Sequence, residues 1–251
     1  MSLKKAIGAV LAAFCLFSAA SAHAEEWTKK SFLMPQGSFE ITGDPARPAM
    51  MGVNLSRDRV AKPINLAPHF YWAATDDLSL GISHGTGLCF NDCRKVYNDV
   101  GFDMMYYLTG SDRFEIDLHA GAPINSFDPF MMGTRAGILG RVNLGSVTAL
   151  VFDPSFYFGI TNRRGGNRES LSLPIWFYFQ ATDVVVPFVG SGLHGPLDDF
   201  TDNFRLPIEG GMLFDVAKDV DVGFMFSFPN VLGPHSTVRD RYMSFLGRFR
   251  F

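Results

Sequence analysis

Histidine and serine are the residue types in this chain that could act as a base and a nucleophile. One histidine, His84, directly follows Ser83. A nucleophile and its general base meet across strands or loops rather than as sequence neighbours. We therefore expect the histidines to be polar residues at strand ends, and we predict no catalytic residue. Beyond residue 24 the histidines are His69, His84, His119, His194 and His235.

Residues 190–195, GSGLHG, match the spacing of the dinucleotide-binding fingerprint G-x-G-x-x-G and follow the apolar run VVVPFV. The fingerprint needs a helix that begins at the glycines, so that the helix N-terminus meets the pyrophosphate. Pro196 and the following LDDFTDN do not favour a helix. We interpret the glycines as a flexible junction between a strand and a loop, and we expect no cofactor.

Two cysteines, Cys89 and Cys93, lie in the short segment CFNDC. A metal site would need about four ligands, and His84 is the one further ligand type nearby. In an exported protein, such a close pair favours a local disulfide bond. We predict this disulfide and no metal site.

The first 24 residues have the layout of a cleavable secretory signal. Lys4 and Lys5 precede an apolar run over residues 6–20, and small residues precede a cleavage site after Ala24. The run is short for a membrane anchor, and Phe14 before Cys15 does not suit lipid attachment. Without Lys4 and Lys5, the chain has 20 basic and 25 acidic residues, a net charge of −5. This balance argues against a nucleic-acid partner.

The rest of the chain alternates between apolar and polar residues with a period of two. In residues 113–120 every odd position is charged or histidine and every even position is apolar. Residues 203–216 and 220–228 alternate in the same way. A soluble strand buries its apolar face, whereas a membrane-barrel strand turns that face outward. The apolar faces here are long and almost free of charge, which favours the barrel, and a soluble secreted β-protein is the alternative.

Short polar turns alternate with longer polar loops between these runs, which predicts an all-β, antiparallel up-and-down barrel over residues 25–251. We expect twelve strands, with ten as the alternative because the first is weakly marked. Prolines 154 and 187 conflict with their strands and predict a bulge or a wrong boundary there. The predicted strands are residues 36–43, 64–75, 77–85, 96–108, 113–124, 132–143, 147–160, 170–181, 184–193, 203–216, 220–229 and 239–251.

Aromatic residues gather near the ends of the predicted strands, as in the aromatic girdles at the membrane interfaces of a barrel. We predict that they contact the lipid interface. They are Phe70, Tyr71, Trp72, Tyr106, Tyr107, Phe156, Tyr157, Phe158, Trp176, Phe177, Tyr178 and Phe179.

The last segment, YMSFLGRFRF, places Met243, Phe245, Phe249 and Phe251 on one face of a strand. With the signal and the alternating strands, this ending resembles bacterial outer-membrane β-barrel proteins of the porin-like class. The resemblance implies an outer-membrane location and reading of the terminal strand by the barrel-assembly machinery. It also implies contact with lipids and lipopolysaccharide, for which the basic loop 162–168 is a candidate. Gly247 interrupts the run of large residues on that face.

The charged residues of the opposite faces are predicted to point into the lumen. They could select solutes in a water-filled pore, or form cross-strand salt bridges that fill a narrow lumen. The hairpin formed by strands 113–124 and 132–143 should bring Arg141 near Glu115. The lumen-facing candidates are Glu115, Asp117, His119, Arg135, Arg141, Arg205, Glu209, Arg248 and Arg250.

Three functions remain open at this point. The first is a passive channel for small hydrophilic solutes. The second is a closed structural or surface-interaction barrel, and the third is a barrel enzyme that acts on lipid or peptide. The sequence does not specify the solute, the open bore or the oligomeric state.

Overall fold

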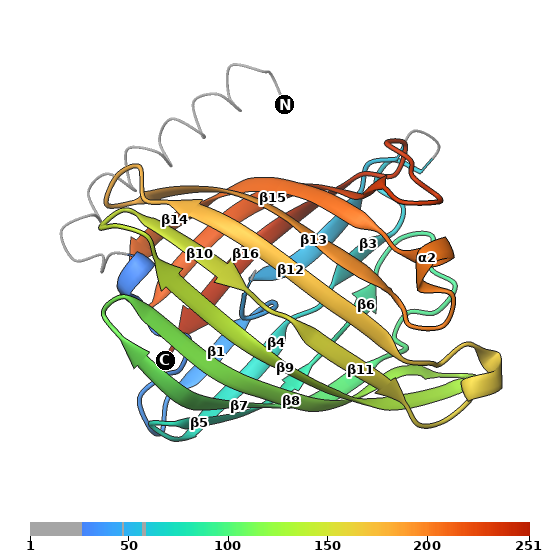
Figure 1. Cartoon of the computed structure of the whole chain (residues 1–251), viewed down its shortest axis with the longest axis horizontal. Coiled ribbons are helices and arrows are strands. Elements are labelled where there is room, and N and C mark those ends of the chain that lie inside the picture. Colours follow the sequence, from blue (N-terminus) through green and yellow to red (C-terminus); the bar gives the residue numbers. More distant parts are fainter. Residues whose placement is uncertain (1–26, 47, 57–58) are drawn as a thin grey trace.

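The computed structural model describes residues 27–46, 48–56 and 59–251, and its wall is one closed antiparallel sheet (Figure 1). The expected signal at residues 1–24 lies outside the described residues. The wall has twelve strand positions in up-and-down order, which confirms the predicted all-β barrel and the count of twelve. No helix in the described ranges is long and apolar enough to cross a membrane.

Four of the twelve positions are built from two short strands each, and the other eight are continuous. The divided positions are β1 (Phe39–Thr42) with β2 (Ala49–Asn54), β3 (Ile64–Leu66) with β4 (His69–Thr75), β5 (Leu78–Ser83) with β6 (Leu88–Cys89), and β10 (Thr148–Phe152) with β11 (Ser155–Gly159). The continuous strands are β7 (Val100–Ser111), β8 (Phe114–Phe127), β9 (Phe130–Asn143), β12 (Ser170–Phe179), β13 (Val185–Pro196), β14 (Leu206–Ala217), β15 (Val220–Leu232) and β16 (Tyr242–Arg250).

Proline explains two of the divided positions. Pro154 separates β10 from β11, because proline lacks the N–H that a ladder hydrogen bond needs. The sequence had predicted a single strand there. Pro68 separates β3 from β4 in the same way. Pro187 is accommodated within β13, opposite Met212 of β14.

The composition of the connecting segments concealed further strand structure. β2 and β6 lie in segments that we expected to be loops. β8 and β9 also extend into the loop expected between them, so that two residues, Asp128 and Pro129, connect these strands. The barrel closes because β16 pairs with β1 through residues 40–42 and with β2 through residues 49–54. After β1, residues 43–46 leave the wall.

The two ends of the barrel differ. At the turn end, the hairpins turn near residues 76, 112, 145, 183 and 218, and the chain terminus Phe251 pairs with Phe39 by backbone hydrogen bonds of 3.1 and 2.9 Å. At the loop end lie longer connections, with the short helices η3 (Arg163–Gly165) and α2 (Phe200–Asn203). Figure 1 shows α2 and the C-terminus at opposite ends of the molecule.

The outer face of the wall is apolar. In β15, Phe226 is 46% exposed while its neighbour Ser227 is 8% exposed, so alternate residues face opposite sides. Exposed apolar side chains recur at every second position of the wall, as the periodicity predicted. Examples are Phe102, Tyr106, Ile138, Phe177, Val189, Ile208 and Phe245.

The prediction of an outward aromatic girdle is wrong for several residues. Tyr71, Trp176 and Tyr178 are buried inside the barrel, whereas Trp72 and Phe177 beside them are exposed. Since neighbours in a strand point to opposite faces, a run of consecutive aromatics must divide between lumen and exterior. Trp176 lies over Gly190 of β13, where a Cβ atom would collide with the indole.

Cys89 and Cys93 form the predicted disulfide, with Cα atoms 5.8 Å apart. The bond lies at the loop end, where β6 pairs with β3.

Mature protein should therefore show no free thiol before reduction. A maleimide label applied to the denatured, unreduced protein should add nothing, and two labels should appear after reduction. Two labels without reduction would contradict the disulfide.

Candidate functional site in the lumen

The loop-end half of the lumen contains a cavity of about 430 Å³. Its wall is polar, because the inward positions of β11 to β16 carry serine and charged side chains there. The lining side chains include Arg135, Ser172, Trp176, Arg205, Glu209 and Ser227.

Hydrogen bonds hold two of the carboxylates in this cavity. Glu209 accepts from Trp176 Nε1 at 2.9 Å and from Ser227 Oγ at 3.2 Å. Asp153 lies 2.7 Å from His119 Nε2. These contacts fix the carboxylates against the wall of the cavity.

The two arginines in the cavity are held more loosely. The closest carboxylate to Arg135 is that of Asp103, at 3.9 Å. Arg205 is anchored through its backbone, which pairs with His194 of β13, and its exposed side chain has no ion-pair partner among the described residues. The cavity can therefore offer guanidinium groups to a solute.

Midway along the lumen, the inward residues 43–46 narrow the passage. Tyr178 donates to the carbonyl of Ala46 at 3.0 Å, and Arg248 donates to that of Pro45 at 2.8 Å. A small void of about 10 Å³ lies beside this segment, between Pro45, Tyr71 and other side chains. That volume is about one water molecule. Side chains are therefore closely packed at this point of the lumen.

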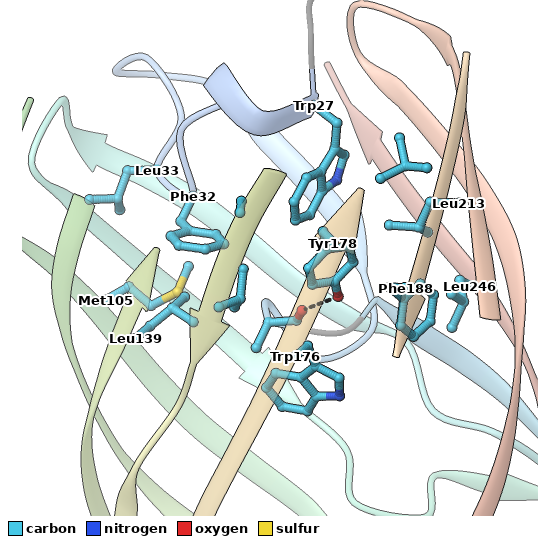
Figure 2. Packing of buried hydrophobic residues seen from close by; sticks show 14 of the residues in the cluster. Trp27, Phe32, Leu33, Met105, Leu139, Trp176, Tyr178, Phe188, Leu213 and Leu246 are labelled. Atoms are coloured by element: carbon cyan, nitrogen blue, oxygen red, sulfur yellow. Dashed lines mark hydrogen bonds between the residues drawn. The ribbon is translucent and has the colours of Figure 1, made fainter. Parts of the chain in front are cut away.

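An apolar cluster occupies part of the turn-end half of the lumen. The segment Trp27–Met34, which we call the plug, enters from the turn end, and the Trp27 ring stacks on Tyr178 with centroids 4.1 Å apart. Phe32 lies under the Arg141 guanidinium, 5.2 Å away. Figure 2 shows plug residues meeting side chains of the wall, among them Met105, Leu139, Phe188, Leu213 and Leu246.

The plug carries a buried ion-pair network at its centre. Lys30 Nζ lies 2.7 Å from Asp215 and 2.9 Å from Asp221, and all three side chains are at most 3% exposed. Asp215 and Asp221 face each other across the β14–β15 hairpin. Lys30 therefore lies between two carboxylates that would otherwise repel each other in a buried site, and Arg248, 3.9 Å from Asp221, supplies a second positive charge.

Backbone groups of the plug meet further charged side chains of the wall. Glu115 accepts from Ser31 Oγ at 2.5 Å and from the Phe32 N–H at 2.9 Å. Arg141 pairs with Glu115 at 2.8 Å and donates to the carbonyl of Lys30. Arg250 donates to the carbonyl of Ser31 at 2.8 Å. The Arg141–Glu115 contact is the one that the hairpin geometry predicted, and here both residues also bind the plug.

The structure divides the predicted lumen residues between the two halves. Arg135, Arg205 and Glu209 line the loop-end cavity. The others are buried deeper in the barrel or contact the plug. They are Glu115, Asp117, His119, Arg141, Arg248 and Arg250.

Sequence reasoning missed the plug altogether. Residues 27–34 have no alternation, and their Lys29-Lys30 pair reads as an exposed basic site. A lysine embedded among Trp, Phe, Leu and Met was the one signal that could have indicated a buried partner.

Among the residues that could do chemistry, one serine and one histidine lie together, and His84 has other partners. His84 contacts the carbonyl of Pro68 at 2.6 Å and the hydroxyl of Tyr97 at 3.1 Å. Ser172 Oγ and His194 Nδ1 are 2.8 Å apart in the loop-end cavity, on the paired strands β12 and β13. Residues 190–195 lie within β13 and so begin no helix.

Metal-ligand side chains are scattered. No group of three or more His, Cys, Asp or Glu side chains is placed to hold a metal ion within the described ranges.

In the basic loop 162–168, Arg163 pairs with Glu169 at 2.5 Å, and this hydrogen bond lowers the pKa of Glu169 below its ordinary value.

Comparisons with known proteins support the fold. No protein-family model matches the chain, and no curated protein matches it in sequence. Among solved structures, the KdgM porin is similar with a TM-score of 0.58 and 8% identity, over 85% of this chain and 99% of that chain. The NanC porin is similar with a TM-score of 0.57 and 8% identity, over 85% and 98%. The chain therefore has the closed β-barrel fold of these porins.

Proposed function

We propose that this barrel is a channel for small hydrophilic solutes and that passage is passive. The observation that carries the proposal is the loop-end cavity of about 430 Å³, which is lined by polar side chains inside a wall with an apolar exterior. A solute that enters could exchange part of its hydration shell for hydroxyl, carboxylate and guanidinium groups. No covalent step is required.

The cavity carries both signs of charge, so the proposed channel should select weakly by charge. Its lining contains the arginines Arg135 and Arg205 and the carboxylates Asp44, Asp153 and Glu209. We expect similar permeability to small anions and cations, measured as a reversal potential close to zero in a salt gradient.

A closed structural barrel is the second candidate function, because the plug and residues 43–46 occupy part of the lumen. Single-channel recording of the refolded mature protein in a planar bilayer separates the two. Discrete current steps would support the channel. A folded, inserted protein that stays silent, both with and without residues 27–34, would support the closed barrel.

A bulky side chain in the cavity should obstruct the proposed channel. Ser227→Trp places an indole in the cavity and should lower the uptake of small sugars into liposomes by about an order of magnitude. Phe226→Trp, one residue away on the outer face, is the matched control and should leave uptake unchanged. Uptake is measured with and without residues 27–34, so that a closed lumen does not hide the effect. Equal uptake by both variants would argue against transport through this cavity.

A further inference from the structure

The plug lies in the lumen in the manner of a bound peptide. We propose that the turn-end half of the lumen is a peptide-binding site, that the plug is its tethered ligand, and that the channel opens when the plug leaves. The opening step rests on the proposed function. The binding site rests on the contacts alone.

The contacts are spaced along the plug as in specific peptide recognition, where pockets hold side chains and polar groups hold the backbone. At one end, the Trp27 ring stacks on Tyr178, and the backbone N–H of Trp27 donates to Gln180 Oε1 at 3.0 Å. In the middle, Lys30 lies between the two aspartates of the β14–β15 hairpin. At the other end, Phe32 is 3% exposed.

The backbone of the plug is recognised by charged side chains of three strands. Glu115 of β8 accepts the Phe32 N–H, while Arg141 of β9 and Arg250 of β16 donate to plug carbonyls. Charge-assisted hydrogen bonds of this kind are about twice as strong as neutral ones. Because these groups face the lumen whether or not the plug is present, they form a site that is already organised for a peptide.

A short tether joins the plug to the wall. Residues 35–38 connect Met34 to β1, and they are held by hydrogen bonds from Gly37 to Ala73 and from Gln36 to Asp76, each 2.8 Å. A short tether gives its ligand an effective concentration on the order of millimolar. For a peptide whose Kd is about 10 µM when free, tethering at this concentration would give a ratio of bound to unbound plug of about 100.

Two features indicate that the plug can be displaced. Asp117, two residues beyond Glu115 on the same face of β8, is completely buried, and neither of its oxygens has a hydrogen-bond partner among the described residues. A buried, unpaired carboxylate is costly, and water that entered an emptied lumen would relieve it. A cavity of about 650 Å³ also lies beside the plug, against Lys29, Ser31 and Tyr107. The plug therefore does not fill its half of the lumen.

The test uses mature protein that lacks residues 27–34, together with a synthetic peptide of residues 25–36, EEWTKKSFLMPQ. The expected result is that the deletion raises the mean current about 100-fold above that of the full mature chain, and that the peptide blocks this current when added from the turn-end side. The matched control is the same peptide with Lys30→Glu, which should not block. Folding of the deletion variant is checked by heat-dependent mobility on a gel.

Each outcome bears on one proposal. Equal currents from the deletion variant and the full chain would overturn the plug as the closing element. A folded deletion variant that stays silent would contradict the channel, and the peptide-binding site would then be judged by fluorescence anisotropy of the labelled peptide. Binding that is lost with the Lys30→Glu peptide would support the site in a silent barrel. No difference between the two peptides would overturn it.

Discussion

Replacing Lys30 by methionine should release the plug from the lumen. Methionine keeps much of the length and apolar contact of the side chain but removes the charge that pairs with Asp215 and Asp221. Removing one partner of a buried ion pair costs about 3–5 kcal/mol, because it leaves an uncompensated buried charge. Here the cost falls on the closed state, since water that enters the lumen can hydrate both aspartates once the plug has left.

The release can be measured with a cysteine in place of Leu33, a plug residue that is 6% exposed. Because Cys89 and Cys93 are bridged, the new thiol is the one available for a water-soluble maleimide. Lys30→Met should raise its labelling rate at least about 100-fold, the equivalent of about 3 kcal/mol. Lys29→Met, at the exposed neighbouring position, is the control and should change the rate little. Equal rates in the two variants would show that the ion pair does not hold the plug.

Replacing Phe226 by arginine should impair assembly of the barrel. Phe226 is in the middle of β15 and faces outward, so the arginine would meet the hydrocarbon core of the membrane. An arginine near the midplane of a barrel's lipid face costs about 2–4 kcal/mol. The folded fraction after refolding into lipid vesicles, read from heat-dependent mobility on a gel, should fall accordingly.

Ser227→Arg is the matched control for this experiment. Ser227 faces the loop-end cavity beside Glu209, so an added guanidinium there would meet water and a carboxylate. Its refolding should remain close to that of the unchanged protein. Equal loss of folding in both variants would contradict the assignment of the two faces.

The wall of the barrel could be predicted from the sequence because membrane strands carry a simple signal. A strand with one face in lipid must keep that face apolar over its length, and so residues 113–120 and 220–228 divide cleanly. Turn residues then mark the hairpins. The predicted strand boundaries were wrong where the composition resembled that of a loop. One example is β2, a strand within a segment rich in proline and charged residues.

The interior could not be predicted as well, because its partners lie far apart in sequence. Lys30 and Asp221 are 191 positions apart, and no local pattern joins them. Inward residues near the turn end, such as Leu213 and Leu246, are apolar because they pack on other side chains instead of water. Such positions are exceptions to the rule that inward residues are polar. Trp176 and Tyr178 are exceptions of the same kind, and by that rule we had placed them on the outer face of the wall.

The origin of the plug's contacts has a consequence for the order of events during assembly. The plug precedes β1 in the chain, yet Asp215, Asp221 and Arg250 belong to β14, β15 and β16, the last three strands. Contacts between such distant positions form late, because the entropy of closing a long loop is lost before the contacts are gained. The plug therefore has no complete site until the final hairpin is in place. We therefore expect the wall to close first and the plug to enter the lumen afterwards from the turn end.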